Sequence, residues 1–207
     1  MPAKSTSVWL PRVIFESALI TVSILLALGL DEWRENREAE ETIRQAMSNF
    51  LSEIKQNKAR VDDAAPFNKG LHDVIEQRDR QGDIQSMSDF IGIMDSYSPV
   101  VLQSTAWETA LATGSLAKMD YGLVSALSLT YGLQSRYEQI NRGAMSRLTS
   151  PQVLSPDTLD LAIYNSLQYL EDVTSMETEL AVVYTEATSV IEINWQKLTG
   201  DLAKHVE

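Results

Sequence analysis

Apolar side chains follow one another almost without interruption near the start of the chain, before a helical spacing of apolar positions begins. From Val13 to Leu30 the sequence reads VIFESALITVSILLALGL, in which only Glu16 and three small hydroxyl residues are polar. Pro11 suits the first position of a helix, because its missing N–H costs nothing there. Residues 11–30 would form about 30 Å of helix, which matches the hydrocarbon core of a bilayer. We therefore predict a transmembrane helix over residues 11–30, after a tail of residues 1–10.

Four residues are candidates for the membrane interface. Trp9 and Trp33 bracket the apolar stretch, where aromatic belts sit. Arg12 precedes Glu16 by one turn, and both this pairing and the N-terminal helix dipole favour a charged Glu16 near the headgroups. Glu16 could instead be an intramembrane carboxylate that meets a partner helix or carries a proton.

A cleavable signal peptide is the competing interpretation of the same stretch. Ala27-Leu28-Gly29 offers a small-x-small cleavage site. Against cleavage, Glu16 interrupts the start of the apolar core and no helix breaker follows Gly29. We expect the stretch to be retained as an anchor.

The flanks of the predicted span suggest its orientation. Lys4, Arg12 and the amino terminus lie on one side, and Arg34, Arg37 and Arg44 lie on the other, so the Lys and Arg count is nearly balanced. The first flank has no acidic residue, whereas the segment from residue 31 to residue 41 has six. We expect the N-terminus to lie inside, in the cytoplasm, and the rest of the chain to lie on the other side of the membrane.

The next stretch has the pattern of one long helix with an apolar seam. No Gly or Pro occurs between Asp31 and Ala65, so the anchor helix should continue directly into it. The seam residues step by 4, 3, 4 and 7 positions and are Ile43, Met47, Phe50, Ile54 and Val61. A lone helix cannot bury this stripe, so it must pack on the long C-terminal helix or on another chain. The comparable lengths favour the C-terminal helix, and Pro66 should end or kink the seam helix at Ala65.

Shorter helices and two further long ones are expected after Pro66. Two short helices should lie on either side of Gly82, and the second should end at Ser98-Pro99. The Thr105 to Glu108 stretch has the spacing of a capping box, with Gly114 as the stop of that helix.

The last two predicted helices are long. Asp120 could cap a helix that runs to about Leu148. Ser155-Pro156 should open the last helix, which has an apolar stripe from Leu159 to Leu198. No alternating run bounded by turn residues suggests a strand. The predicted fold is all-α, with one transmembrane helix that continues into a long-helix bundle over residues 31–207.

Charge and composition exclude several functions. The net charge is −12, and the first 30 residues contribute +1, which leaves −13 on residues 31–207. A domain with this net negative charge repels nucleic-acid phosphates, so we expect no nucleic-acid partner. The chain has no cysteine and two histidines, and it contains no phosphate-binding loop or nucleophile elbow. We expect no enzyme activity, no metal site and no cofactor.

A group of aromatic and charged residues in the second half of the chain is the best candidate for a ligand pocket. Trp107, Tyr131 and Arg136, with Glu108 beside them, could hold a small amphipathic ligand. Aromatic residues at helical spacing are more often core residues, and we favour that interpretation.

The N-terminal residues resemble the start of a group of uncharacterised bacterial single-pass membrane proteins. The similarity lies in Glu16-Ser17, Leu19-Ile20, the stretch from Ser23 to Ala27, and Asp31-Glu32-Trp33. The stretch from Ser104 to Ala110, with Gly114, is similar to a central segment of the proteobacterial members. The resemblance covers about 60 residues, and it implies an inner-membrane location and a helical domain without a known activity.

These observations favour a non-enzymatic, membrane-anchored helical protein. Its partners would be the lipid bilayer and either a second copy or another subunit of a membrane complex. A helical bundle that senses a ligand outside the membrane and acts through a partner is the alternative.

Overall fold

The computed structural model describes residues 9–148, 150 and 155–204, and among these residues it has helices but no strand. The chain divides into two compact units, Met1–Arg44 and Gln45–Glu207. The second unit therefore begins 15 positions after the predicted end of the membrane span at Leu30. Each unit is described separately below.

The first unit consists of the N-terminal part of helix α1, which spans Trp9–Gln81 and has 73 residues. Every side chain from residue 13 to residue 38 is exposed. In the described part of the chain, α1 is the one helix long and apolar enough to cross a membrane, and its apolar window is not buried in the protein. The predicted continuous helix over residues 11–65 is confirmed, because α1 contains it.

The prediction that the helix ends at Ala65 is wrong. Helix α1 continues through Pro66 for another 15 residues, to Gln81, and ends at Gly82, which has a φ of 70°. Pro66 removes one helical hydrogen bond, but its side chain is exposed. The next turns are held by three buried side chains, those of Asn68, Leu71 and Ile75. Their burial offsets the cost of the proline.

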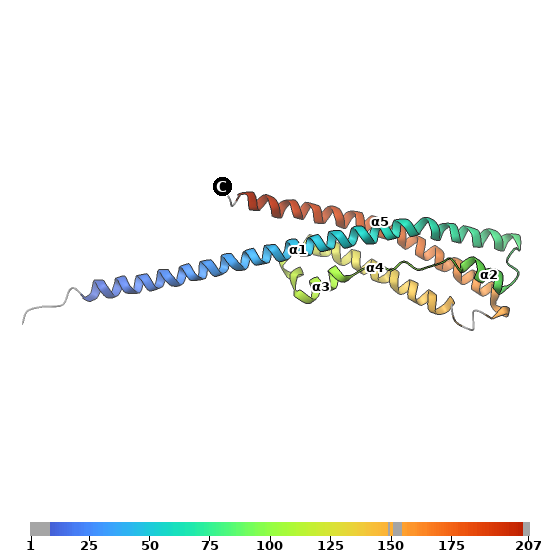
Figure 1. Ribbon diagram of the computed structural model, residues 1–207, viewed down its shortest axis with the longest axis horizontal. Helices are drawn as coiled ribbons and strands as arrows, with labels where there is room; N and C mark the ends of the chain where they lie inside the picture. Colours follow the sequence, from blue (N-terminus) through green and yellow to red (C-terminus); the bar gives the residue numbers. More distant parts are fainter. Residues whose placement is uncertain (1–8, 149, 151–154, 205–207) are drawn as a thin grey trace, which may run out of the picture. The chain divides into compact units, whose positions relative to one another are not determined.

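The second unit is a bundle of three long helices (Figure 1). Residues 45–81 of α1 pack with α4, which spans Tyr121–Leu148, and with α5, which spans Leu159–Lys204. Lys55 pairs with Glu192, and Asn68 bonds to Glu177, so α5 runs antiparallel to α1. Helix α4 runs parallel to α1, because Glu53 and Asn57 of α1 bond to Tyr131 and Gln134 of α4 in the same order.

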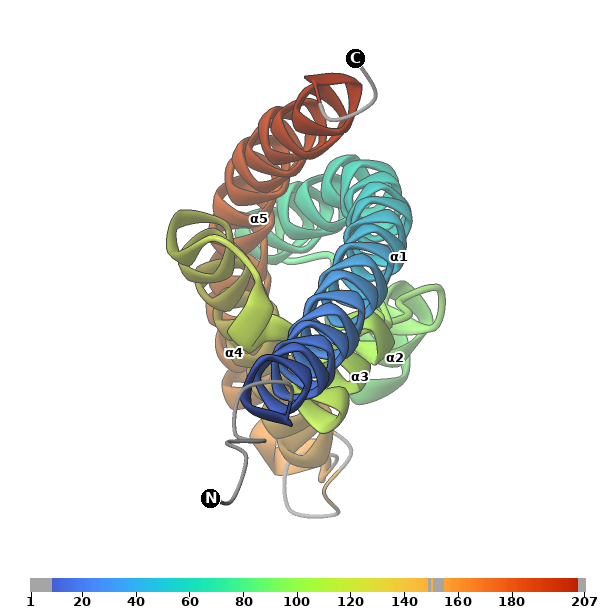
Figure 2. The ribbon, with the colours of Figure 1, turned by 90° about the vertical axis from the view of Figure 1, so that its left-hand side faces the viewer.

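The fourth side of the bundle is built from short pieces. These are α2 (Met87–Met94), a connector of residues 95–104, α3 (Thr105–Thr113) and the 3-10 helix η1 (Ser115–Lys118). Viewed along the bundle, α2 and α3 lie beside α1 (Figure 2). The connector runs back along α1, since Gln103 contacts Asn57 and Val101 contacts Arg60. It takes the place of a continuous fourth helix.

Both predicted apolar stripes lie in the core of the bundle. On α1, Met47, Phe50, Ile54 and Val61 are at most 1% exposed, whereas Ile43 lies in the first unit and is half-buried. On α5 the completely buried residues of the stripe include Leu170, Val173, Leu180, Tyr184 and Ile191. The seam is therefore covered inside the chain, as the helix lengths suggested.

The helix ends agree with the sequence at some positions and differ at others. Asp120 accepts the N–H of Leu123 at 3.2 Å and so caps α4, and Gly114 ends α3 with a φ of 69°. The predicted capping box of α3 is wrong, because α3 has its N-cap at Ser104, whose side chain makes no cap bond. A capping box lies instead on α2, between Ser86 and Asp89. The 3-10 helix η2 (Pro156–Thr158) precedes α5, with Ser155 at its N-cap.

Replacing Phe50 by Ala should destabilise the bundle strongly. Phe50 is fully buried, and it contacts the rings of Trp107 and Tyr131 at 6.4 and 6.0 Å between centroids. Truncating such a residue costs roughly 3–5 kcal/mol, a large part of the stability of a small domain. Urea denaturation of residues 31–207 should give a much lower midpoint for Phe50→Ala. Phe67→Ala is the control, because Phe67 is 44% exposed and should shift the midpoint little. Equal shifts for the two variants would contradict this account of the core.

Candidate functional site

The predicted pocket residues do not come together around one cavity. Trp107 stacks on Tyr131, with ring centroids 5.4 Å apart and an interplanar angle of 17°. Tyr131 is buried and Trp107 is half-buried beside Phe50, so these two rings pack onto the core. Glu108 is exposed and accepts the Ser104 hydroxyl at 2.7 Å. Arg136 is also exposed and lines a separate groove on α4. The sequence pattern placed the aromatic pair correctly in the core, but its charged neighbours point elsewhere.

A carboxylate from α1 caps helix α3. Glu53 is buried and accepts the backbone N–H of Ala106 at 3.0 Å, in the first turn of α3. Its other oxygen accepts the Tyr131 hydroxyl at 2.7 Å. Free N–H groups at the start of a helix are stabilised by an anionic acceptor. Glu53 therefore caps the N-terminus of α3 in place of the predicted local capping box. This bond holds the first turn of α3, which carries Trp107, next to Phe50.

An amide pair holds the connector one turn further along α1. Asn57 is completely buried, donates to the backbone oxygen of Gln103 at 2.7 Å and accepts the Gln103 N–H at 2.9 Å. Gln134 of α4 donates to the same backbone oxygen at 2.8 Å. The Oε1 atom of Gln134 accepts from Asn57 and from the Tyr184 hydroxyl, each at 3.0 Å. Helices α1 and α4 therefore both bond to one residue of the connector, and α5 joins the network through Tyr184 and Gln134.

A second buried polar group, here called the Glu177 cluster, lies closer to α2. Glu177 of α5 is 1% exposed, and its Oε1 atom accepts from Asn68 at 2.6 Å and from the Tyr137 hydroxyl at 2.9 Å. The cluster also contains Asn141, which accepts the Tyr169 hydroxyl at 2.8 Å. Tyr169 in turn bonds to Tyr97, at the start of the connector. The Oε2 atom of Glu177 and the Nδ2 atom of Asn141 have no partner among the described residues.

Burial governs the titration of this cluster. Burial raises the pKa of Glu177 above its ordinary value, although the hydrogen bonds from Tyr137 and Asn68 act in the opposite direction. Burial likewise raises the pKa values of the Tyr137 and Tyr169 phenols, so both stay protonated and can donate. The cluster joins α1, α4, α5 and the connector.

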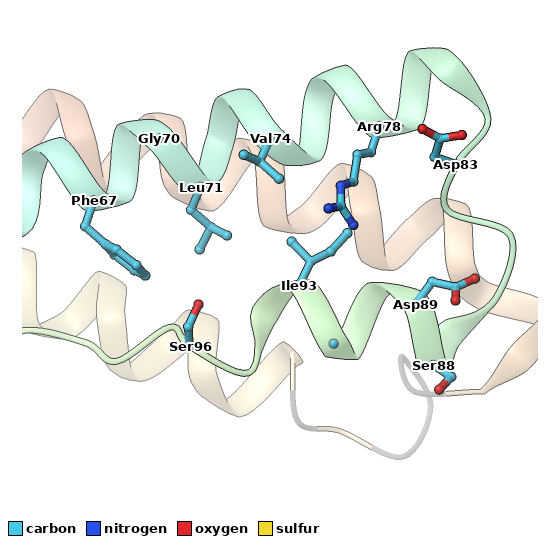
Figure 3. A pocket seen from close by; sticks show the side chains of 11 residues that line it. Phe67, Gly70, Leu71, Val74, Arg78, Asp83, Ser88, Asp89, Ile93 and Ser96 are labelled. Carbon is cyan, nitrogen blue, oxygen red and sulfur yellow. The ribbon is translucent and has the colours of Figure 1, made fainter.

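An open groove lies between α1 and α2 (Figure 3). It has a volume of about 760 Å³, within the range of small-molecule sites. Apolar side chains form its wall and floor, namely Phe67, Leu71, Val74 and Ile93. Gly70 and Gly92 also line it, and a Cβ added at either would meet nothing within 4 Å. The missing side chains leave this space open.

Charged residues gather at one end of this groove. Arg78 points from α1 toward Ile93, Asp83 follows the end of α1, and Asp89 lies on α2 (Figure 3). The Asp89 carboxylate accepts the backbone N–H groups of Ser86 and Gln85 at 2.9 and 3.2 Å. Hydrogen bonding, first of all from the Ser86 side chain, lowers the pKa of Asp89, so the group is anionic. None of these residues belonged to the predicted pocket; the Arg78–Gly82–Asp83 spacing at a helix end was the only signal.

A second surface feature, here called the α4 strip, lies on the outer face of α4. Tyr121 is 87% exposed and Leu129 is 62% exposed. Small residues lie between them, and the whole strip is lined by Tyr121, Val124, Ser125, Ser128, Leu129, Gly132, Leu133 and Arg136. Exposed apolar side chains that form a contiguous patch can mark a surface that contacts another protein.

The predicted interface residues lie on the first unit. The side chains of Trp9 and Arg12 fall outside the described part of the chain, whereas Glu16 and Trp33 are exposed. The Arg37 guanidinium lies 4.8 Å from the centroid of the Trp33 ring. Arg34 pairs with Glu38 at 3.4 Å, one of the ion pairs expected of a solvated helix.

Metal ligands do not gather in the part of the chain that the structure describes. No group of three or more His, Cys, Asp or Glu side chains there could hold a metal ion. His72 faces Asp73 at 3.5 Å on the surface.

Comparisons with protein-family models, with curated proteins and with solved structures give no match. The functional argument therefore rests on the residues of the chain itself.

The Glu177 cluster should make stability depend on pH. A carboxyl with a raised folded-state pKa keeps its proton to higher pH in the folded chain than in the unfolded chain. Stability is then lost as the pH rises from the ordinary value of 4.5 through the raised pKa of Glu177. Glu177→Gln keeps an acceptor for Asn68 and Tyr137 but cannot ionise. The variant should therefore gain stability relative to the parent chain when both are moved from about pH 4 to about pH 8.

Urea midpoints of both chains at the two pH values measure this difference. Glu179→Gln, on an exposed position of the same helix, is the control and should show no such gain. A difference between parent and Glu177→Gln that stays constant with pH would show that the carboxyl does not titrate with folding.

Proposed function

We propose that this chain is a non-enzymatic, single-pass membrane protein of the bacterial inner membrane, whose helical bundle assembles with a protein partner. One observation carries the membrane part of the proposal. The apolar stretch over residues 13–30 is exposed on every side, and it belongs to the same helix that supplies Phe50 and Ile54 to the bundle core. Exposing an apolar stretch of this length to water is unfavourable, whereas the hydrocarbon core of a bilayer accommodates it. We place the N-terminus in the cytoplasm and the bundle in the periplasm, on the basis of the acid-free first flank.

The assembly part rests on where binding can occur. The interior of the bundle is filled by its own side chains, with Leu127, Leu180 and Ile191 completely buried. A partner must therefore bind to the surface of the bundle, and the α4 strip is the best candidate for such a contact. Residues 31–207 have a net charge of −13, so most of the bundle repels another acidic surface. The strip itself has no acidic residue, and its one charge is that of Arg136. A partner helix with apolar side chains fits this chemistry.

Membrane attachment and orientation can be tested with one variant. The chain has no cysteine, so Ser135→Cys places a single thiol on the exposed surface of α4. We expect the full chain to remain in the membrane fraction after alkaline extraction, with an intact mass that includes residues 1–30. A membrane-impermeant maleimide should label it before lysis. Labelling only after lysis would place the bundle in the cytoplasm, and a mature N-terminus near Leu30 would show a cleaved signal peptide.

The assembly proposal predicts a cross-link from the α4 strip. A photoreactive phenylalanine analogue at Leu129 of the full chain, activated in native membranes, should give one discrete product at a mass above the monomer. The same analogue at Glu179, which is exposed on α5, should give none and serves as the control. A product of twice the monomer mass identifies a second copy, and any other discrete mass identifies an accessory subunit. Monomer alone at both positions would rule out assembly through this strip.

A further inference from the structure

We propose that the groove between α1 and α2 binds a small zwitterion with an apolar body, of the kind of an aliphatic or aromatic amino acid. This inference goes beyond the assembly role and does not depend on it. It would also supply the ligand of the sensing alternative. It rests on the lining of the groove and on two charges that the protein leaves unpaired (Figure 3).

The two unpaired charges are of opposite sign. Among the described residues, the Arg78 side chain makes no ion pair or hydrogen bond, and neither does the Asp83 side chain. The neighbouring Arg80 does pair, with Glu76 one turn earlier. Arg78 and Asp83 line the same end of the groove without neutralising each other. A guanidinium presents several donors to a carboxylate, and an aspartate accepts from an ammonium group.

The charge balance of the groove selects a zwitterion over a simple ion. A pure anion bound at Arg78 would meet the two carboxylates of Asp83 and Asp89, and a pure cation bound at the carboxylates would meet Arg78. A ligand with a carboxylate and an ammonium group satisfies both signs at once. Asp89 is held in place by Ser86 and Gln85, so it supplies a fixed negative charge on the ammonium side.

The apolar lining of the groove determines the kind of side chain that the ligand carries. Phe67 is 44% exposed and Val74 is 41% exposed, although both are large apolar residues. Leu71 is buried below them, and Ile93 faces them from α2. An aliphatic or aromatic side chain of the ligand would cover this surface and be desolvated with it. The open space beside Gly70 and Gly92 is where that side chain would lie.

Titration calorimetry on the full chain in lipid nanodiscs tests the proposal. Nanodiscs avoid detergent, whose apolar tails would compete for the groove. The probes are L-phenylalanine and L-leucine. L-phenylalaninamide, which lacks the carboxylate, and N-acetyl-L-phenylalanine, which lacks the ammonium group, should each bind about tenfold more weakly or worse, as expected when a charge-assisted hydrogen bond is lost. Glycine, which lacks the apolar body, should not bind measurably.

Variants locate the site. Arg78→Gln and Asp83→Asn should each weaken L-phenylalanine binding about tenfold or more. Their matched controls, Arg80→Gln and Asp79→Asn, lie on the same turns of α1 outside the groove lining and should leave the affinity unchanged. Gly92→Leu should abolish binding by filling the groove, and its circular dichroism spectrum should match the parent because α2 has room for the side chain.

Three results would overturn the proposal. They are no heat of binding for either amino acid up to a Kd of about 10 mM, binding of the amide or of the acetylated analogue as tight as that of L-phenylalanine, and unchanged affinity in Arg78→Gln with the parent's unfolding midpoint.

Discussion

The bundle depends on one requirement, which is that the backbone of the connector must find hydrogen-bond partners without a helix or a strand. Residues 95–104 run along α1 where a fourth helix would otherwise lie, and backbone groups buried there are costly if left unpaired. Side chains of the long helices supply the partners. Asn57 and Gln134 bind the backbone of Gln103, and Arg60 donates to the oxygen of Val101 at 3.0 Å. Just after the connector, in the first turn of α3, Glu53 accepts the N–H of Ala106. These polar side chains are as necessary to the fold as the apolar stripes.

The same requirement explains why so many polar residues lie inside an acidic protein. Glu53, Asn57, Asn68, Gln134 and Glu177 are each at most 7% exposed. A buried polar group destabilises the fold unless its partners are in place, so each one selects the single alignment of helices in which it is satisfied. The apolar stripes alone would permit α1, α4 and α5 to shift along one another. The polar layers fix the alignment, and Glu177 shows the cost, since one of its oxygens has no partner among the described residues.

Sequence reasoning recovered the long helices because their signals are local. The apolar spacing of Met47, Phe50 and Ile54 requires no knowledge of the partner helix. Gly82 and Gly114 mark helix ends through their backbone preference, and Asp120 marks one through the cap that its side chain forms. The end predicted at Ala65 was wrong because the preference of Pro66 was outweighed by the burial of Leu71 and Ile75, which is a tertiary effect. The cap of α3 was missed because its acceptor is 53 residues away in sequence, on Glu53. The groove was missed for the same reason, since α1 and α2 meet only in the folded chain.

The clamp on the connector has a consequence for how this chain can diverge. Gln103 is held through its backbone N–H and oxygen, so the clamp makes no demand on its side chain. The demand falls instead on Asn57 and Gln134, whose amides must donate and accept at fixed positions on different helices. Substitutions that change only the Gln103 side chain are therefore cheap, and a change at residue 57 or 134 requires a compensating change at the other. In a lineage of such chains, residue 103 would be free to vary, and the evolutionary constraint on the path of the connector at that point would be recorded in residues 57 and 134.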